Sequence, residues 1–447
     1  MNQSNEKPQG GPHPEGHGPE GVAPRRDFLK TAAVAATAFP AIIKAQSVTN
    51  AIKIGLVGCG GRGTGAAAQA LQADDYGTLT AMADVFQERI DDSLENLGRA
   101  RKGVLAGRLK VEKQSQFTGL DAYAKLVNSG VDVVLLATPP GFRPMHLDAC
   151  IQAGKHVFCE KPVAVDSFGI RQVMATVEMA KQKNVSLVAG FCWRYNQTIK
   201  ATFDQIANGA IGDILNYYAT YYTSPVKPMP AASTRPAGMS DVEWQIRNWY
   251  NFTWLCGDSL VEQAVHSVDK VAWAMKDQPP VSCVAVGGRQ IPAEGGNIFD
   301  HFSVHYLYPK DVRAVVANRQ IEGCYNENAD YIMGTKGICT IGRGGVPKIA
   351  GTTNWTYEKQ GNEIDMYQVE HNELFASIRK GKPINDGARM TTSTMLALMG
   401  RMAAYTGQSI TWEQAMNSQE RVFPEKLDWA MSLPVAPMAR PGLTKFI

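Results

Sequence analysis

A glycine-rich loop near the start of the chain has the spacing of a phosphate-binding turn. The segment AIKIGLVG (51–58) is almost continuously apolar, which predicts a buried strand, and GCGGRG follows it directly. This is G-x-G-x-x-G leading into the helix-forming run TGAAAQALQA. The first glycine permits a tight turn, the second lets the backbone approach a pyrophosphate, and the third allows close packing of a helix whose N-terminus attracts the anion. We therefore expect a dinucleotide to contact Gly58, Gly60, Gly61, Arg62 and Gly63.

A carboxylate follows the next strand at the spacing that such a loop requires. The segment TLTAMADVF (78–86) predicts a second buried strand, and Asp84 comes about twenty residues after the loop. An aspartate at this point accepts hydrogen bonds from the ribose diol of NAD and repels the 2′-phosphate of NADP. NAD is therefore favoured over NADP, although Arg62 and Arg89 weaken the preference. The alternative is that Asp84 only ends the strand.

A predicted helix in the second half of the chain carries polar side chains that suit proton transfer. In SLVEQAVHSVDKVAWAM (259–275) an apolar stripe leaves Glu262, His266 and Asp269 together on the neighbouring face. Histidine titrates near neutral pH, so His266 suits the removal of a proton from a hydroxyl group. Glu262 lies one turn away, but with Ser259 it also fits a capping box that would only hold the helix N-terminus. Both roles of Glu262 stay open, and we expect Asp269 to orient or pack.

Strands and helices alternate through the first half of the chain. After the two strands above come VDVVLLATPP (131–140), the helical DACIQAG (148–154), KHVFCEKP (155–162) and VSLVAGF (185–191). This order predicts a doubly wound parallel sheet with right-handed crossovers. A sheet in a second domain is predicted by HFSVHYLYP (301–309), VRAVVANRQI (312–321) and GICTIG (337–342).

Four motifs together resemble the Gfo/Idh/MocA family, named for glucose–fructose oxidoreductase and inositol dehydrogenase. They are GLVGCGGRG, ATPPGFRPMH, AGKHVFCEKPVA and VEQAVHSVD, in the family's order over nearly all of residues 50–410. The resemblance implies an α/β fold. An NAD-binding Rossmann domain would cover 50–193, and a substrate-binding α/β domain with an open, largely antiparallel sheet would cover 194–447. Most members are sugar or cyclitol oxidoreductases, and a minority use the same hydride step to cleave glycosides.

The resemblance also implies roles for individual residues. Lys161 of the EKP motif would lie near the nicotinamide and the reacting hydroxyl, where an ammonium stabilises a developing alkoxide. The alternative for Lys161 is a surface lysine at the start of a loop. His266 matches the family's catalytic histidine, whereas Glu262 departs from the usual Asp by one methylene group. Further cofactor contacts would come from Thr138, Pro139, His146, Glu160 and Lys161.

Aromatic and basic side chains suit a substrate pocket. Arg194 and Tyr195, in FCWRYN, follow the last predicted strand of the first domain and could face an inter-domain cleft, although an ion pair would also explain Arg194. Trp249 and its neighbouring tryptophans could stack on the C–H faces of a sugar, and Arg247 could hold hydroxyls or a carboxylate. Core packing of one or two of these tryptophans is the alternative.

Composition argues against several other classes of protein. Lys and Arg total 45 against 42 for Asp and Glu, so there is no basic excess for nucleic acid. The eight cysteines are scattered, with neither a CxxC pair nor a histidine at zinc-finger spacing. His301 and His305 share one strand face without a local carboxylate or cysteine, so we expect no metal.

The N-terminal residues have the features of an export signal. Residues 1–24 are rich in Gly and Pro with hardly an apolar side chain, which predicts a disordered lead-in. Arg25 and Arg26 precede an apolar run, 32–43, that is shorter than the roughly 20 residues needed to span a bilayer. Residues 25–45 resemble a twin-arginine signal peptide, although Pro24 stands where Ser or Thr is more usual. The alternative is an amphipathic helix of a cytosolic protein.

These inferences predict an exported, periplasmic NAD-dependent oxidoreductase that transfers a hydride between a ring carbon and NAD. Its small-molecule partner would be a sugar, glycoside or cyclitol. Free NAD is not expected outside the cytoplasm, so we expect tightly bound NAD, loaded before the twin-arginine export machinery moves the folded chain. We also expect a homo-oligomer. Two alternatives remain: an NAD-dependent glycoside hydrolase or lyase with transient ring oxidation and no net redox, and a non-catalytic sugar-binding protein.

Overall fold

The computed structural model describes residues 50–291, 295–342, 345–359 and 361–447. The predicted lead-in (1–24) and signal peptide (25–45) lie outside the described residues. Among the residues that are described, no helix is both long enough and apolar enough to cross a membrane.

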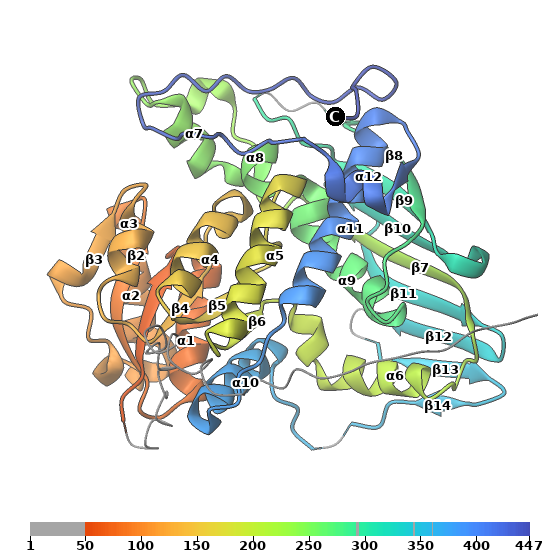
Figure 1. Cartoon of the computed structure of the whole chain (residues 1–447), viewed down its shortest axis with the longest axis horizontal. Helices are drawn as coiled ribbons and strands as arrows, with labels where there is room; N and C mark the ends of the chain where they lie inside the picture. Colours follow the sequence, from red (N-terminus) through yellow and green to blue (C-terminus); the bar gives the residue numbers. More distant parts are fainter. Residues whose placement is uncertain (1–49, 292–294, 343–344, 360) are drawn as a thin grey trace, which may run out of the picture. The chain divides into compact units, whose positions relative to one another are not determined.

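Six parallel strands form the N-terminal sheet, in the order β3-β2-β1-β4-β5-β6 (Figure 1). The strands are β1 (Lys53–Val57), β2 (Thr78–Asp84), β3 (Gln116–Thr118), β4 (Val133–Leu136), β5 (His156–Cys159) and β6 (Leu187–Ala189). The helices between them are α1 (Gly61–Ala73), α2 (Gln87–Arg99), α3 (Ala122–Val127), α4 (Arg143–Gln152) and α5 (Ser167–Gln182). All four residues of the central strand β4 are buried, because helices cover both faces of the sheet. The predicted doubly wound parallel sheet is thus confirmed.

The strand order reverses between β1 and β4. A crevice opens at such a point beyond the carboxyl ends of the strands, and ligands of open α/β sheets bind there. The glycine loop follows β1, the TPP segment follows β4, and the EKP motif follows β5. The topology therefore brings three of the sequence motifs to one edge of the sheet.

The second sheet has nine strands in the order β14-β13-β12-β11-β7-β10-β9-β8-β15. Its strands are β7 (Ile214–Thr223), β8 (Ser282–Gly288), β9 (His301–Leu307), β10 (Arg313–Gln320), β11 (Glu327–Gly334), β12 (Gly337–Gly342), β13 (Lys348–Gly351), β14 (Trp355–Thr356) and β15 (Ile410–Thr411). The pair β7 and β10 is parallel and the other paired strands are antiparallel. The expected open, largely antiparallel sheet is confirmed. Helices α6 (Gln197–Ala207) and α9 (Val265–Ala274) lie over one face, as Figure 1 shows.

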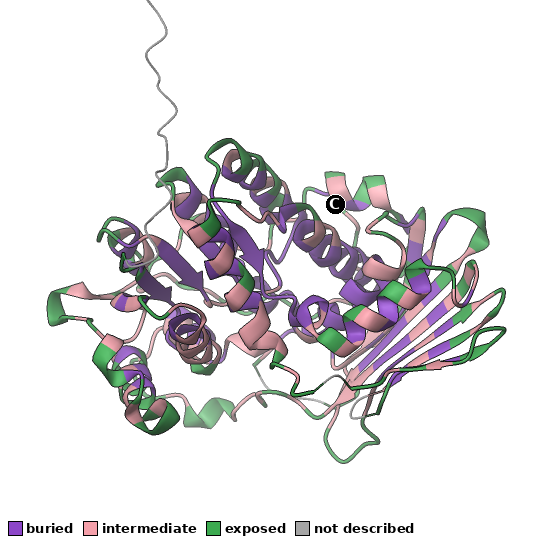
Figure 2. Ribbon diagram, turned by 90° about the horizontal axis from the view of Figure 1, so that it is seen from below, coloured by how far each residue is buried: buried purple, intermediate pink, exposed green. Residues whose placement is uncertain are grey.

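Helices from the C-terminal part return to the first sheet. α10 (Met366–Lys380) packs on α1, and α11 (Gly387–Thr406) packs against α5, α9 and β8. Figure 2 shows α11 as largely buried, and its Arg401 is fully buried, donating to the carbonyl oxygens of Val165 (2.7 Å) and Gly257 (3.1 Å). A division at residue 193 therefore separates the two sheets but not the helices that cover them.

A small aromatic cluster lies beside the carboxyl end of the parallel sheet. It joins α7 (Asp241–Arg247), α8 (Thr253–Cys256) and the C-terminal segment that follows α12 (Trp412–Asn417). Phe423 packs on Phe142 and Trp254 with ring centroids 5.3 and 5.6 Å apart. Trp254 is therefore a core residue, as one of the two interpretations of the tryptophans expected.

Candidate active site

The glycine loop joins β1 to α1. Gly58 has φ +93°, a left-handed conformation that favours glycine, and a Cβ at Gly63 would lie 1.9 Å from the Gly58 carbonyl oxygen. A Cβ at Gly60 or Gly61 would meet nothing within 4 Å. The fold itself therefore requires glycine at positions 58 and 63, whereas the other two glycines keep space open at the N-terminus of α1.

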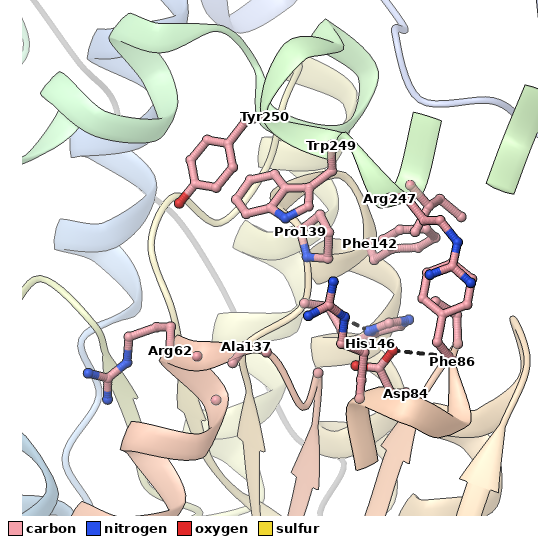
Figure 3. A pocket seen from close by; sticks show the side chains of 18 of the residues that line it. Arg62, Asp84, Phe86, Ala137, Pro139, Phe142, His146, Arg247, Trp249 and Tyr250 are labelled. Atoms are coloured by element: carbon pink, nitrogen blue, oxygen red, sulfur yellow. Dashed lines mark hydrogen bonds between the residues drawn. The ribbon is translucent and has the colours of Figure 1, made fainter. Parts of the chain in front are cut away.

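That space belongs to a cavity of about 400 Å³, which we call the glycine-loop pocket (Figure 3). It brings together most of the expected cofactor contacts: Gly58, Gly60, Gly61, Arg62, Gly63, Asp84, Thr138, Pro139 and His146. In Figure 3, Trp249 and Tyr250 lie together at one end of this pocket, and Arg247 and Phe86 lie at the other. The pocket is thus bounded on one side by the parallel sheet and on the other by the segment around α7.

Asp84 both ends its strand and lines the pocket. Its Oδ2 accepts a hydrogen bond from Cys59 N (2.7 Å) and its Oδ1 accepts one from Phe86 N (3.1 Å). Burial raises the pKa of Asp84, while these backbone donors and the nearby Arg89 oppose that shift. The two interpretations of Asp84 are therefore compatible, since the carboxylate that holds the glycine loop also borders the pocket.

His146 carries an unpaired nitrogen into the same pocket. Its ring stacks on Tyr123 with centroids 4.2 Å apart, and Nδ1 lies 3.2 Å from Thr138 Oγ1. Burial, followed by the charge of Arg143, lowers the pKa of His146 to about 3, so the ring is neutral. Nε2 is buried without a hydrogen-bond partner in the described part of the chain. An unpaired ring nitrogen on a residue that lines the same pocket as Gly60 and Gly61 fits a bound dinucleotide.

A second cavity of about 500 Å³, the Lys161 pocket, adjoins the first. Its lining includes Glu160, Lys161, Glu262 and His266. Both cavities are lined by Arg62, Ala137, Trp249 and Tyr250. The Lys161 side chain is only 11% exposed, so it is not a surface lysine. The predicted proton-transfer and electrostatic groups therefore lie together in the cavity that adjoins the glycine-loop pocket.

Lys161 is fixed by Glu262. Its Nζ donates to the Glu262 carbonyl oxygen (2.6 Å) and to Glu262 Oε1 (3.2 Å). Burial raises the pKa of the Glu262 carboxyl group, and the charges of Lys161 and Arg143 oppose that shift. The ammonium is thereby held against the helix that carries the histidine.

The capping-box interpretation of Glu262 is wrong. Ser259 makes no side-chain cap, and its hydroxyl donates instead to the carbonyl oxygen of Phe299 (3.0 Å). The residues 260–264 form a π-helical turn before α9, where the sequence predicted one regular helix from Ser259. A π turn changes the phase of a helix, and such turns are frequent at functional sites. Here Glu262 faces Lys161 instead of the helix N-terminus.

His266 is buried in a positively charged setting. Its exposed fraction is 9%, and Nδ1 has no hydrogen-bond partner among the described residues. Burial, then the charges of Lys161 and Lys270, hold the pKa of His266 well below 6.5. The imidazole is therefore neutral at physiological pH and can accept a proton.

Glu160 is held by its neighbours. Its Oε1 lies 3.0 Å from Arg62 Nε, and its Oε2 accepts from Lys161 N (3.1 Å). A Cβ at Gly190 would lie 2.7 Å from Glu160 Oε2, so the two residues are tightly packed. Glu160 therefore links the glycine loop to the EKP segment.

The structure does not bring Arg194 or Tyr195 into the Lys161 pocket. Arg194 forms a buried ion pair with Asp269 (Nε to Oδ1, 3.0 Å) and another with Asp277. The ion-pair interpretation of Arg194 is thus correct, because a guanidinium in this position must be paired. The Tyr195 hydroxyl donates to Asp386 Oδ2 (2.7 Å) and is also buried. Both side chains hold the junction between domains.

The two other expected substrate contacts divide between the pockets. Arg247 lines the glycine-loop pocket, where it pairs with Glu88 (Nη1 to Oε1, 2.7 Å) and lies 3.7 Å over the Phe86 ring. It is therefore on the cofactor side. Trp249 lines both pockets and stacks on Tyr250 with centroids 3.8 Å apart.

Several lining residues of the Lys161 pocket were not predicted. Arg143, in the GFRPMH motif, donates to the Pro162 carbonyl oxygen (2.5 Å). The Tyr221 hydroxyl donates to Gln263 Oε1 (3.1 Å). Arg143 begins α4, the helix that follows β4, so an arginine in the first turn of a helix at the carboxyl edge of the sheet is the signal that could have identified it. Tyr221 comes from β7, and its place follows only from the packing of the two sheets.

Neither the histidines of β9 nor the cysteines form a metal site in the described residues. The expectation that no carboxylate accompanies these histidines is wrong, because His301 Nδ1 lies 2.7 Å from Asp300 Oδ1. His305 Nε2 lies 3.1 Å from Ser303 Oγ. All eight cysteines are free, and all but the exposed Cys324 are buried.

The fold and the two pockets together define an α/β protein with a glycine-loop pocket and, beside it, a cavity lined by Lys161, Glu262 and His266. Residues 52–191 match the Gfo/Idh/MocA model, described as an oxidoreductase family with an NAD-binding Rossmann fold. The match agrees with the resemblance that the motifs indicated, and it covers the parallel sheet with its helices.

The chain is similar to a dehydrogenase and to a glycosidase. The myo-inositol 2-dehydrogenase of Thermotoga maritima is 31% identical over 161 residues, covering 36% of this chain and 42% of that enzyme. The alpha-N-acetylgalactosaminidase of Shewanella oneidensis is 26% identical over 173 residues, covering 38% of this chain and 35% of that protein. The chain thus matches less than half of the length of either relative.

Solved structures extend the likeness to the second domain. The aldose-aldose oxidoreductase from Caulobacter crescentus, solved with glycerol, has a TM-score of 0.63 and 18% identity. The match covers 81% of this chain and 100% of that one. At this identity the likeness shows a shared fold.

Proposed function

We propose that the chain is an oxidoreductase that transfers a hydride between a ring carbon of a sugar or cyclitol and tightly bound NAD. The observation that carries this proposal is the shared wall of the two pockets, with Lys161, Glu262 and His266 in the pocket that adjoins the glycine loop. The names of the T. maritima and C. crescentus proteins support a sugar or cyclitol as substrate.

The side chains divide the chemistry as follows. Bound NAD supplies the hydride acceptor. Neutral His266 takes the proton of the hydroxyl group as the ring carbon is oxidised. The Lys161 ammonium stabilises the developing alkoxide, and Glu262 positions that ammonium through the contacts described above.

Tight cofactor binding is supported by the segment that covers the adenosine side of the glycine-loop pocket. Arg247 connects α7 to Glu88 of α2, and Trp429 packs on Phe86 with ring centroids 6.0 Å apart. A dinucleotide beneath these contacts would leave only after they open. Export to the periplasm rests on Arg25, Arg26 and the apolar run that follows. A retained cofactor would make such export compatible with redox chemistry.

Retention requires that the redox cycle close on the enzyme. Oxidation of one sugar leaves two electrons on the cofactor, so a second, oxidised substrate must take the hydride and a proton. The alternative is a redox-neutral glycoside hydrolase or lyase, which the likeness to the S. oneidensis protein favours. In that reaction a ring hydroxyl is oxidised, the neighbouring C–H bond loses its proton, the glycosidic group is eliminated, water adds in the hydrolase, and the hydride returns.

We also propose a homo-oligomer. The face of the nine-stranded sheet that α6 and α9 leave open exposes Val284 (50%), Val286 (68%), Met333 (40%) and Ile338 (47%). Exposed apolar side chains gathered on one sheet face suit contact with a second copy. The molar mass in solution, measured by light scattering, tests this: a monomer at all concentrations would contradict it.

The decisive experiment is a substrate screen with product analysis. Purified protein is incubated with free sugars, cyclitols and glycosides, singly and in pairs, without added NAD. Net oxidation of one compound coupled to reduction of another supports the oxidoreductase. Release of an aglycone with no oxidised product supports the glycoside-cleaving alternative, and absence of both reactions with NAD bound would contradict each enzymatic proposal.

A further inference from the structure

A third cavity opens beside the Lys161 pocket. This side pocket has a volume of about 240 Å³ and lies between the segment 225–229, the π turn before α9, and the ends of β8 and β10. It shares Val226, Tyr250, Glu262 and Gln263 with the Lys161 pocket. The two cavities therefore meet at the residues that face the reacting sugar in the proposed function.

The shared wall is polar and ordered. Glu262 contacts Lys161 on one side and accepts a hydrogen bond from Gln263 Nε2 on the other. Gln263 Oε1 in turn accepts from the Tyr221 hydroxyl (3.1 Å). Tyr250 lines all three cavities. A ligand that crosses from one pocket to the other would pass hydrogen-bonding groups at the junction, as an oxygen linking two rings requires.

The rest of the side pocket is mainly apolar. Its walls include Pro225, Met229, Ile298 and Ile321. Two further apolar residues are strongly exposed, Val226 at 49% and Ile291 at 56%. Exposed aliphatic side chains that border a cavity suit a ligand that covers them. The C–H face of a sugar ring or the face of an aromatic ring has that character.

Besides Glu262, the charged groups that line the side pocket are Lys227, Arg289, Asp300 and Glu322, two of each sign, so they do not select an anion. Lys227 donates to the Arg247 carbonyl oxygen (2.6 Å), and Arg289 donates to the carbonyl oxygens of Ile298 (2.8 Å) and Gly296 (3.0 Å). Asp300 accepts from the backbone N–H groups of Gln290 and Ile291. By contrast, Gln320 Nε2 is buried with no hydrogen-bond partner in the part of the chain that the structure describes. A neutral ligand with a hydrogen-bond acceptor suits this lining better than a phosphate.

We propose that the side pocket binds the second ring of a glycoside whose first ring occupies the Lys161 pocket. The substrate would then be a glycoside, with either a second sugar or an aromatic aglycone, and not a free monosaccharide. This inference rests on the proposed function for the identity of the first ring as a sugar. It assigns the apolar wall to the second ring, Gln320 to an acceptor on that ring, and the junction at Glu262 and Gln263 to the glycosidic oxygen.

The test compares binding by the NAD-containing protein. The probes are the methyl and phenyl glycosides of D-glucose, D-galactose and D-mannose in both anomeric forms, with lactose and cellobiose. Dissociation constants are measured by calorimetry for the wild type and for Ile321→Trp, which enlarges a side chain that lines the side pocket but not the Lys161 pocket. The control is Val104→Trp, at a position that is 73% exposed and lines none of the three cavities. Gln320→Ala removes the unpaired donor.

The wild type should bind at least one phenyl glycoside or disaccharide about tenfold more tightly than the methyl glycoside of the same sugar, or about 1.4 kcal/mol. Ile321→Trp should abolish that preference while leaving methyl glycoside binding within about twofold, and Val104→Trp should change neither. Gln320→Ala should reduce the preference. A preference for disaccharides over phenyl glycosides identifies the ring as a sugar, and the reverse identifies an aromatic aglycone.

Two results would overturn the inference: no extended ligand binds better than its methyl glycoside, or the preference survives Ile321→Trp. The proposed function has a separate readout, the ultraviolet absorbance of bound NADH. A binding preference without any reduction of bound NAD would support the side pocket and contradict the oxidoreductase. If methyl glycosides and extended ligands both reduce bound NAD and bind with equal affinities, the oxidoreductase is supported and the side pocket is contradicted.

Discussion

Lys161 Nζ lies 2.6 Å from the carbonyl oxygen and 3.2 Å from the Oε1 of Glu262, a residue 101 positions further along the chain. The pair joins the EKP segment after β5 of the parallel sheet to the π turn before α9 in the second domain. The cation that the proposed reaction assigns to the alkoxide is therefore held by both domains. Changes at Glu262 should affect the reaction through Lys161 more than they affect folding.

The variant Glu262→Gln tests whether Glu262 positions Lys161 or only stabilises the fold. The amide keeps the size of the side chain but removes the negative charge that holds the ammonium, so we expect kcat to fall by roughly 10-fold to 10²-fold. Because no capping box is present, the melting temperature should change little. Glu262→Asp, which keeps the charge, should recover part of the activity. A variant with wild-type kcat and a much lower melting temperature would show a structural role instead.

His266→Asn should remove the proton acceptor. We expect turnover to fall by about 10²-fold to 10⁴-fold, the usual contribution of a general acid or base. The His266 side chain lines a cavity, the Lys161 pocket. The folding and the NAD content of the variant should therefore remain close to those of the wild type. Steady-state kinetics, circular dichroism and cofactor analysis on the same preparation check this. Normal turnover in the variant would refute the assignment.

The pH at which the oxidation rate falls should depend on the charge of Lys161. Burial, then the charges of Lys161 and Lys270, lower the pKa of His266, so kcat/KM should fall only when pH drops well below 6.5. Lys161→Met removes one of those charges. The pKa of His266 should then rise, and the acidic limb of the profile should move to higher pH, together with a loss of rate.

Lys200→Met, at an exposed position on α6, is the matched control and should leave the profile unchanged. If the acidic limb of the Lys161→Met profile coincides with that of the wild type, the titrating group is not His266.

Local pattern was sufficient to predict the first sheet and the glycine loop. The run VVLL predicted the central strand β4 because a strand buried on both faces must be apolar throughout. The spacing of Gly58, Gly60 and Gly63 predicted the loop, since the backbone requires glycine at 58 and 63 while Gly60 leaves open space for the expected dinucleotide. In these cases neighbours in the sequence set the structure.

Long-range packing set what the sequence did not predict. Arg194 and Tyr195 follow the last parallel strand, where a substrate contact was expected. Both side chains are buried, and Arg194 bonds to Asp269 while Tyr195 bonds to Asp386. The π turn at 260–264 has no sequence periodicity of its own, and the capping-box pattern at Ser259 pointed to the wrong geometry. The contribution of Tyr221 depends on how β7 faces α9, which no local pattern encodes.

The glycines of the loop should separate into two classes. Gly63→Ala places a methyl group against the Gly58 carbonyl oxygen, and we expect a loss of about 3 kcal/mol in the free energy of unfolding. At Gly60 the backbone has φ −70° and a Cβ meets open space, so Gly60→Ala should fold normally. The added methyl group would instead narrow the glycine-loop pocket and weaken NAD binding. Thermal denaturation and NAD content of both variants distinguish the two effects, and equal stability losses would contradict this division.

Retention of NAD should depend on the contacts that cover the adenosine side of the glycine-loop pocket. Protein purified without added nucleotide and then denatured should release NAD or NADH in near-stoichiometric amounts.

Arg247→Ala removes the ion pair with Glu88 and the cation–π contact with Phe86. Because Arg247 is partly exposed, we expect the dissociation rate of NAD to rise only about 5-fold to 10-fold. Arg313→Ala, at an exposed position on β10 far along the chain from the pocket lining, is the control and should not change that rate. Wild-type protein that is isolated without nucleotide and exchanges added NAD rapidly would contradict tight binding, and with it the argument that a cofactor loaded before export could support redox chemistry afterwards.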